Sequence, residues 1–263
     1  MAENKNRFPA GTFRPAPQPS ETSHLIAAQA KMEALLIARH GEQLLLTLFI
    51  PMALLVGLSV VPVLDSQDPV RDVFPMVLAV AAMSAGFTGQ AIAVGFDRRY
   101  GALKRIGASG LPRWGIIAGK CSAVAIIVAG QFFIFAAAAA LLGFSAPFGA
   151  WILAFIATIV GAGVFTSMGL LMGGTLSAEL ILALANLIWF VLVGAASLVA
   201  VGPELSSGVE ALLKILPSTA LTELIAEAFA CRVDYYALVV LLLWGGICGA
   251  LAIRFFSFES RDE

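Results

Sequence analysis

The chain has 263 residues, of which 60% are hydrophobic and only 13% are charged, and its formal net charge is −1. Soluble domains average about 25% charged residues, so this composition excludes an ordinary water-soluble protein. The three cysteines have no C-x-x-C spacing, and neither a disulfide framework nor a zinc site is expected. We expect a membrane protein that has no nucleic-acid partner.

The first 41 residues precede any membrane-spanning segment. Residues 1–22 hold four prolines among polar residues and predict a disordered cytoplasmic tail. Residues 23–41 favour a helix, but they are too short and too charged to cross a bilayer. Because Leu25, Met32 and Leu36 recur on one face, we predict an amphipathic helix that lies along the cytoplasmic interface.

The rest of the chain contains five long stretches without a charged residue or a histidine. Each is about as long as the ~20 residues needed to cross a bilayer, and the third is long enough for two crossings. Lipid-facing backbone must be hydrogen-bonded within its own segment, so each crossing must be a helix. We therefore predict an all-α integral membrane protein. Residues 42–256 would form one domain with six spans, at about 43–64, 73–95, 115–142, 150–173, 180–201 and 236–256.

Lysine and arginine are distributed unevenly between the two sides of this topology. Thirteen of the 16 lie in the N-terminal segment, in or beside the loop after the second span, or near the C-terminus, which includes the tail 257–263. Because cytoplasmic segments are enriched in these residues, both termini and this loop are predicted to be cytoplasmic. An even number of spans also places both termini on one side.

The loop after the second span, residues 95–114, reads GFDRRYGALKRIGASGLPRW. Its basic character is explained in part by topology or by contact with anionic lipid. Phe96, Tyr100 and Leu103 nevertheless share one helical face, which predicts a short amphipathic helix over about 97–106. Such a helix would offer both an apolar face and a basic face to a partner.

Residues 202–235 resemble neither a span nor a simple loop, and they predict two short amphipathic helices separated at Pro217. Ser218 and Thr219 are expected to cap the second helix. Both helices would lie extracellularly, where they either dip into the outer leaflet or cover an exit.

Several kinds of chemistry find no support in the sequence. No predicted span carries an ionisable residue near its centre, which disfavours a proton- or sodium-coupled carrier. The segment 115–121 resembles a phosphate-binding loop only loosely, because its spacing is one residue short and its last residue is cysteine. We interpret it as the start of the third span, with the Lys120 side chain extending to the membrane surface. The sequence has no catalytic or metal-binding motif, so this chain is not expected to be an enzyme.

A few polar residues lie inside the predicted spans, and Gln90, Gln131 and Asn186 have the largest polar groups. Such residues either hydrogen-bond between helices or line a polar path, and the sequence leaves both roles open. Glycine pairs at G-x-x-x-G spacing would let helices approach closely. These pairs are Gly115/Gly119, Gly169/Gly173 and Gly245/Gly249.

The six-span order, the cytoplasmic N-terminal helix, the outer helical insert and above all the basic loop resemble the ABC transporter type-2 permease family over about 24–256. In that family the loop carries an acidic-basic start, a G-T-L step, an L-x-A-T-P step and a lysine entering the third span. Asp97 stands here for the usual Glu, Ala102 for Thr, and Gly110 near the usual Pro. The matching residues are Asp97-Arg98-Arg99-Tyr100-Gly101-Ala102-Leu103-Lys104-Arg105-Ile106-Gly107-Ala108-Ser109, then Leu111-Pro112-Arg113-Trp114 and Lys120.

The resemblance implies that this loop is a coupling helix that docks in a groove of a separate ATP-binding subunit. Closure of two such subunits would rock two permease chains, identical or related, between inward- and outward-facing states. ATP and Mg would be bound by the partner, and this chain would hold no cofactor and no metal. The expected cargo is an amphipathic or apolar compound, such as a drug, an antibiotic or a lipid, exported through a bacterial plasma membrane.

Two groups of residues are predicted to carry this function. Those for coupling to the ATPase are Asp97, Arg98, Arg99, Tyr100, Gly101, Leu103, Lys104 and Arg105. Those for the substrate path, between two chains along the first, second and fifth spans, are Gln90, Asn186, Trp189 and Phe190. The alternative is a non-transporting membrane scaffold or assembly factor that recruits a cytoplasmic partner through the same loop.

Overall fold

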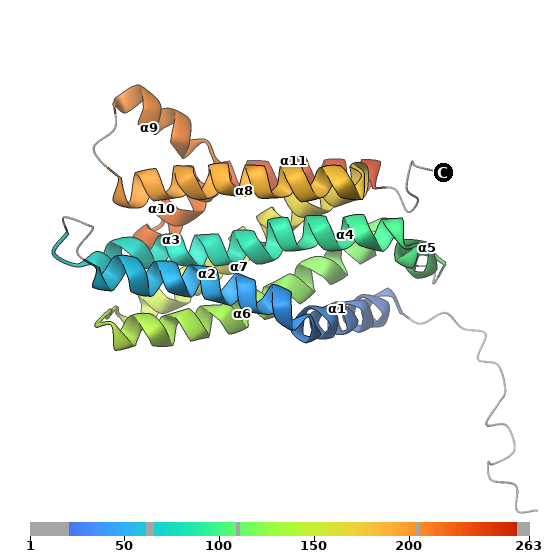
Figure 1. Ribbon diagram of the computed structural model, residues 1–263, viewed down its shortest axis with the longest axis horizontal. Coiled ribbons are helices and arrows are strands. Elements are labelled where there is room, and N and C mark those ends of the chain that lie inside the picture. Colours follow the sequence, from blue (N-terminus) through green and yellow to red (C-terminus); the bar gives the residue numbers. More distant parts are fainter. Residues whose placement is uncertain (1–20, 62–65, 109–110, 203–205, 257–263) are drawn as a thin grey trace, which may run out of the picture.

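The computed structural model describes residues 21–61, 66–108, 111–202 and 206–256, and within these ranges every regular element is helical (Figure 1). The predicted tails 1–22 and 257–263 lie almost entirely outside the described residues. The helices in chain order are α1 (Thr22–Arg39), α2 (Gly41–Val60), α3 (Pro69–Met83), the π-helix η1 (Ser84–Thr88), α4 (Gly89–Arg99), α5 (Ala102–Gly107), α6 (Arg113–Leu141), α7 (Phe148–Thr175), α8 (Ala178–Val201), α9 (Ser207–Lys214), α10 (Pro217–Phe229) and α11 (Tyr235–Phe255).

Among the residues that the structure describes, five helical segments are long and apolar enough to cross a membrane. One is the second predicted span, in which α3, η1 and α4 run without a break over Pro69–Arg99; the others are α6, α7, α8 and α11. The first predicted span, α2, is a helix of 20 residues whose apolar part covers Thr47–Val60. The regular structure of the described residues is therefore entirely helical and includes five candidate spans, and the sixth crossing stays a prediction.

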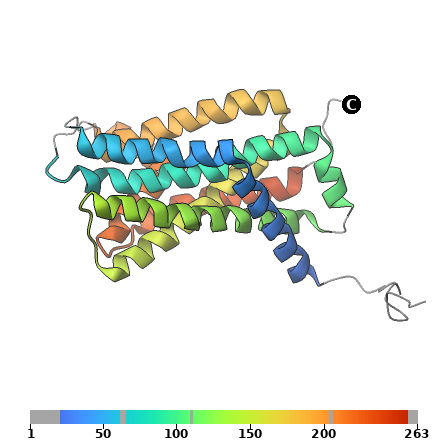
Figure 2. The ribbon, with the colours of Figure 1, turned by 60° about the horizontal axis from the view of Figure 1, so that its bottom comes forward.

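The long helices lie side by side in one bundle, and α1 crosses them obliquely at one end (Figure 2). The second span lies inside this bundle, since every residue of α3 from Val73 to Met83 is buried. It packs against α2, α7, α8 and α10. Because α7 also contacts α6, α10 and α11, α7 and the second span together form the centre of the fold.

Glycines let α7 approach the second span closely. A Cβ atom added at Gly169 would lie 2.6 Å from the carbonyl oxygen of Phe87, and one at Gly173 would lie 2.8 Å from that of Ala91. Only a residue without Cβ fits where backbones meet at such distances. The predicted close approach at this pair is confirmed, and it occurs between two helices of the same chain.

The second span contains one turn of π-helix, η1, which contacts α8. Ser84 Oγ donates a hydrogen bond to the carbonyl oxygen of Val80 at 2.8 Å and accepts one from Trp189 Nε1 at 3.0 Å. Single π-turns within α-helices are frequent at functional sites. The Trp189 indole therefore fixes α8 against the irregular turn of the second span.

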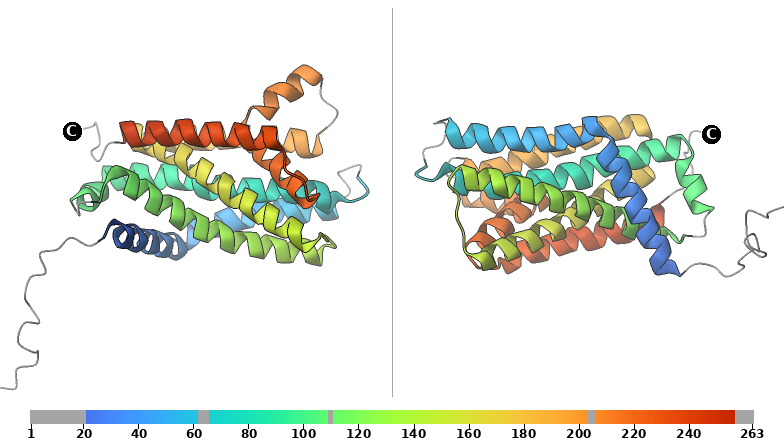
Figure 3. Two further views of the ribbon diagram at one scale, coloured as in Figure 1. Left: turned by 180° about the vertical axis from the view of Figure 1, so that it is seen from behind. Right: turned by 90° about the horizontal axis from the view of Figure 1, so that it is seen from below.

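The amphipathic helix α1 packs chiefly on α6 (Figure 3). Its polar face points inward. Gln29 and Glu33 are buried, whereas Met32 and Leu36 are exposed. The predicted apolar stripe therefore faces away from the bundle. A helix at a lipid interface is expected to present its apolar side in this way.

The predicted insert before the last span is present as α9 and α10, which are separated at residues 215–216. The predicted cap is wrong, because Ser218 and Thr219 lie inside α10 and Leu216 is its N-cap residue. Pro217 occupies the first turn, where its missing N–H costs no hydrogen bond. α10 is buried against α3, α7, α8 and α11, whereas α9 projects from the bundle (Figure 3).

An aromatic cluster fills the core where α10 meets α3 and the hairpin between α6 and α7. The ring centroid of Phe229 lies 5.3 Å from that of Phe74, 4.9 Å from Phe144 and 5.3 Å from Trp151. Aromatic pairs at these separations stabilise a core beyond simple burial. We call this end of the bundle the far end and the end with α1 and α5 the basic end.

Candidate functional site

The basic loop has a different course from the single helix predicted over 97–106. α4 continues to Arg99, Gly101 adopts a left-handed conformation with φ of 70°, and the six-residue helix α5 begins at Ala102. Glycine adopts this backbone conformation without strain, so the chain turns here and the helix is broken. Asp97 consequently lies in the last turns of α4 and is not the first residue of a separate helix.

Arg98 is turned into the bundle and not toward a partner. Its side chain is buried, and Nη1 donates hydrogen bonds of 3.0 Å to the carbonyl oxygens of Gly173 and Leu176. These carbonyls end α7, where the helix dipole favours a positive charge. The guanidinium of Arg98 is therefore held by this chain, and its role in coupling to an ATPase stays a prediction.

The apolar face of α5 also points inward. Leu103 is fully buried and packs with Val94, Ile117, Leu170 and Phe256. Leu103 therefore anchors α5 to its own bundle, and its role in coupling to a partner stays a prediction.

Tyr100 is the exposed member of the predicted apolar face. Its ring is stacked on that of Phe96 with 6.0 Å between centroids, and the residue is 71% exposed. Arg99 is exposed as well, but it forms an ion pair with Glu179 at the start of α8. The hinge between α4 and α5 is thus tied to α8 by an ion pair while it offers an aromatic ring to solvent.

A charge cluster lies beneath the loop; Gln29, Glu33 and Lys120 are buried, and Asp97 lies at its edge with a side chain that is 35% exposed. We call it the buried charge cluster. Lys120 Nζ lies 2.7 Å from Glu33 Oε1 and 3.3 Å from Asp97 Oδ2, and the lysine side chain is fully buried. Gln29 Nε2 donates a 2.8 Å hydrogen bond to the same Glu33 oxygen. The prediction that Lys120 extends to the membrane surface is wrong, because two carboxylates hold it inside.

The loop also exposes several aromatic and cationic residues, which we together call the loop surface. It combines two aromatic residues, Tyr100 and Trp114, the latter 49% exposed, with three basic residues of α5 and the start of α6. Aromatic residues and arginine are the groups that most often anchor protein interfaces. Its members are Tyr100, Lys104, Arg105, Arg113 and Trp114.

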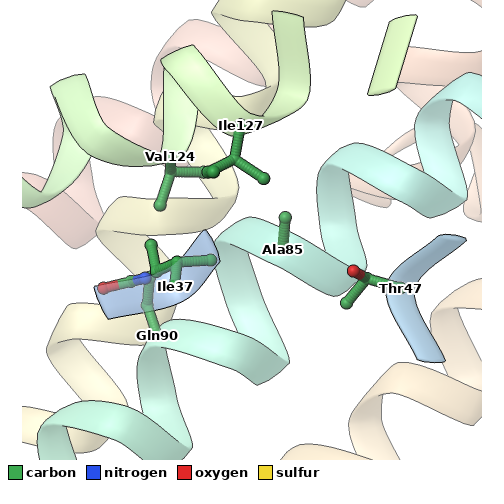
Figure 4. Close-up of a pocket in the computed structure, with 6 residues that line it drawn as sticks. All are labelled: Ile37, Thr47, Ala85, Gln90, Val124 and Ile127. Carbon is green, nitrogen blue, oxygen red and sulfur yellow. The ribbon is translucent and has the colours of Figure 1, made fainter. Parts of the chain in front are cut away.

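The four residues predicted for the substrate path do not come together. Gln90 is buried and lines a small cavity with Ile37, Thr47 and Val124, which come from α1, α2 and α6 (Figure 4). The Oε1 atom of Gln90 has no hydrogen-bond partner there. A buried acceptor of this kind favours an ordered water molecule.

The other three predicted path residues lie on α8. Trp189 is half-buried and bonded to η1, and Phe190 is exposed beside it with ring centroids 5.0 Å apart. Asn186 is also exposed, and its Nδ2 donates to the carbonyl oxygen of Leu182 at 2.8 Å. An amide therefore sits on the outward face of an otherwise apolar helix.

A pocket of about 360 Å³ opens at the far end between α3, α8 and α10. Arg71, Asp72 and Glu223 form its polar wall, and Val199 and Phe229 contribute to its apolar wall. Burial raises the pKa of the Glu223 carboxyl, against the opposing effect of Lys214 at 3.3 Å. Sequence reasoning missed this pocket because its walls come from three segments far apart in the chain.

The fold defines a helical membrane protein with several apolar helices long enough to span a bilayer. Among the described residues, no group of three or more His, Cys, Asp or Glu could hold a metal ion. Residues 24–230 match the family described as ABC-2 type transporter. This match covers most of the 263 residues, and the chain belongs to the ABC-2 type transporter family. It is therefore a membrane permease of an ABC system, and the family implies an ATP-binding partner. No curated protein matches the chain.

Proposed function

We propose that this chain is the permease subunit of an ATP-driven exporter, and that two copies of an ATP-binding subunit dock on the loop surface. The observation that carries the proposal is that the loop exposes aromatic and cationic residues while neighbouring residues attach it to the helix bundle. Leu103 packs α5 into an apolar cluster, and Arg98 bonds the end of α4 to the end of α7. A short helix held in this way suits groove recognition by a partner, with its basic residues setting orientation.

ATP hydrolysis is assigned to the partner and not to this chain. A phosphate-binding loop needs irregular backbone between a strand and a helix. Residues 115–121, the nearest match in the sequence, lie within α6, and Lys120 is already held by Glu33 and Asp97. ATP and Mg would therefore bind to the partner subunit alone.

The proposed topology has six crossings, with the basic end in the cytoplasm of a bacterium. A helix of 20 residues, the length of α2, spans about 30 Å, which matches the hydrocarbon thickness of a bilayer. The excess of lysine and arginine at the basic end sets the orientation. The far end, with α9 and α10, would then face the exterior.

A second permease chain, identical or related, is proposed to cover the outward face of α8. Asn186 and Phe190 are exposed there in the single chain. A polar amide facing lipid is unfavourable, whereas the same amide between two chains finds partners or lines a path. The substrate path would thus follow α8 and leave Gln90 in a structural position.

An amphipathic or apolar compound, such as a drug, an antibiotic or a lipid, is the proposed cargo. α8, which is proposed to border the path, is apolar and has no ionisable residue among its described positions beyond Glu179. The far-end pocket joins a charged wall to an apolar wall and is proposed as the exit. An amphipathic molecule satisfies both walls of such a pocket.

The test is co-purification from the native membrane in mild detergent, followed by mass spectrometry. We expect an ATP-binding subunit in about equal amount with the native chain. Reversing the exposed charges in K104E/R105E/R113E should release it, because electrostatic complementarity at the loop surface is lost. The control is R254E, an exposed arginine at the end of α11.

Retention of the ATPase by the triple variant would contradict docking at the loop surface. If no ATP-binding subunit accompanies the native chain, export is contradicted and the scaffold alternative takes its place. Insertion of every variant into the membrane is measured in parallel, so that a loss of partner is not confused with a loss of chain.

A further inference from the structure

The buried charge cluster joins three separate elements at the base of the loop. Lys120 belongs to α6, Glu33 to α1 and Asp97 to α4. An ammonium group has three donors and can therefore serve both carboxylates at once. Gln29, one turn before Glu33, bonds to the same carboxylate oxygen and fixes its position.

α1 is placed so that it can transmit a displacement of the loop. Its main packing partner is α6, where a Cβ atom added at Gly119 would lie 2.8 Å from Gln29 Cγ. α1 leads into α2 through the single residue His40. Lys120 contacts both Asp97 at the loop and Glu33 on α1. It therefore connects the loop through α1 to α2, the first predicted span.

Asp97 lies near the hinge at which the loop turns. Only four positions separate it from Gly101, where the backbone reverses before α5. A displacement of α5 by a docked partner must act on the end of α4 first. The Asp97 side chain is 35% exposed, whereas Lys120 and Glu33 are buried, and one ammonium group contacts both carboxylates. Removal of Lys120 would leave the buried Glu33 carboxylate without its cation and would separate the end of α4 from α1.

We propose that Lys120 is a positioning residue that makes α1 move together with the loop. This inference rests on the proposed function, because the displacement comes from closure of a docked ATP-binding subunit. Lys120 itself contacts neither nucleotide nor cargo. Its role is to hold Glu33 and Asp97 at one point, so that α1, and with it α2, follows α5.

The test measures the distance between spin labels at exposed positions of α1 and the end of α5. Labels are placed at L35C and A108C in a chain carrying C231S, which removes the exposed cysteine. Labelled chains are diluted into an excess of unlabelled chain and reconstituted with the ATP-binding subunit. The distance distribution is compared between the nucleotide-free complex and the complex trapped with ATP and vanadate.

With Lys120 present, the distance and its spread should be the same in both states, because α1 and α5 move as one body. In K120M the distribution should widen, and its mean should shift on trapping by roughly one helical turn, about 5 Å. K120R keeps the charge and should restore the native result. A purely structural role for Lys120 would change the amount of folded chain but not this nucleotide-dependent distance.

The triple variant K120M/E33Q/D97N leaves no unpaired charge and keeps the test valid if K120M fails to fold. It should also lose the fixed distance. An unchanged distance in either variant would overturn the inference, because packing alone would then hold α1 to the loop. Failure of the unaltered chain to bind the ATP-binding subunit would instead contradict the proposed function.

Discussion

The basic end and the far end of the bundle are stabilised by different interactions. At the basic end, buried Lys120 and Arg98 are satisfied by carboxylates and by backbone carbonyls of other helices. At the far end, the rings of Phe74, Phe144 and Phe229 pack against one another in edge-on and stacked pairs. Charged residues line the pocket beside Phe229. Buried directional bonds distinguish the basic end, and aromatic packing distinguishes the far end.

This difference matters for what each end can do. A hydrogen bond or ion pair keeps one geometry until it breaks, so the basic end can pass on a displacement without deforming. Packed rings tolerate small shifts but lose much free energy when a ring is removed. Removing one residue at each end should therefore give effects of different size and kind.

The largest effect is expected for F229A at the far end. Truncating this ring removes three aromatic contacts and leaves a cavity, which costs about 3–5 kcal/mol of unfolding free energy. Thermal unfolding of the purified chain in detergent would measure the loss. The control is F148A, because Phe148 is 81% exposed at the start of α7. Equal melting temperatures for the two variants would contradict the central role of the cluster.

A smaller effect is expected for R98A at the basic end. The carbonyl oxygens of Gly173 and Leu176 lose their donor, which costs about 1–3 kcal/mol for buried groups left unsatisfied. Limited proteolysis should cut the α7–α8 junction faster in R98A than in the native chain. R105A removes an exposed arginine of α5 and should leave the cleavage rate unchanged. A native rate in R98A would show that α7 needs no cap.

The smallest effect is expected for E223Q, which tests charge at the far end. Burial raises the pKa of Glu223, so the folded state favours the neutral carboxyl and native stability decreases as the pH rises through that pKa. The neutral glutamine should therefore raise the unfolding free energy at pH 7 by less than about 1 kcal/mol, which gives a slight rise in the melting temperature. The gain should shrink as the pH falls. A stability gain of E223Q that grows as the pH falls would contradict a raised pKa of Glu223.

The helical segments were predictable because their causes are local. Long uncharged stretches require helices in lipid, and α6, α7, α8 and α11 follow the predicted ranges closely. The two helices of the insert were also predictable from a local cause, because Pro217 interrupts any continuous helix. The cap at Ser218 was a misreading, because proline prefers the first helical turn and places the cap before itself.

The arrangement at the basic end was not predictable from local patterns. Lys120 meets Glu33 and Asp97 only after α1, α4 and α6 have packed, and nothing in the sequence near Lys120 indicates those partners. The same holds for Arg98, whose acceptors belong to the end of α7. The break at Gly101 did have a local signal, since a glycine inside a predicted helix favours a turn. Trp114, the exposed ring of the loop surface, stood within the recognised motif but outside the predicted coupling residues.

The π-turn at Ser84–Thr88 changes the direction, around the helix axis, of the side chains that follow it in the second span. Each residue of an α-helix advances the direction of side chains by about 100°. The wider turn shifts this phase between α3, which faces the far-end core, and α4, which carries Asp97 and Arg98. The side chains of α4 are thus rotated about the helix axis relative to the phase that α3 alone would set, and this one backbone turn contributes to the direction in which the loop faces.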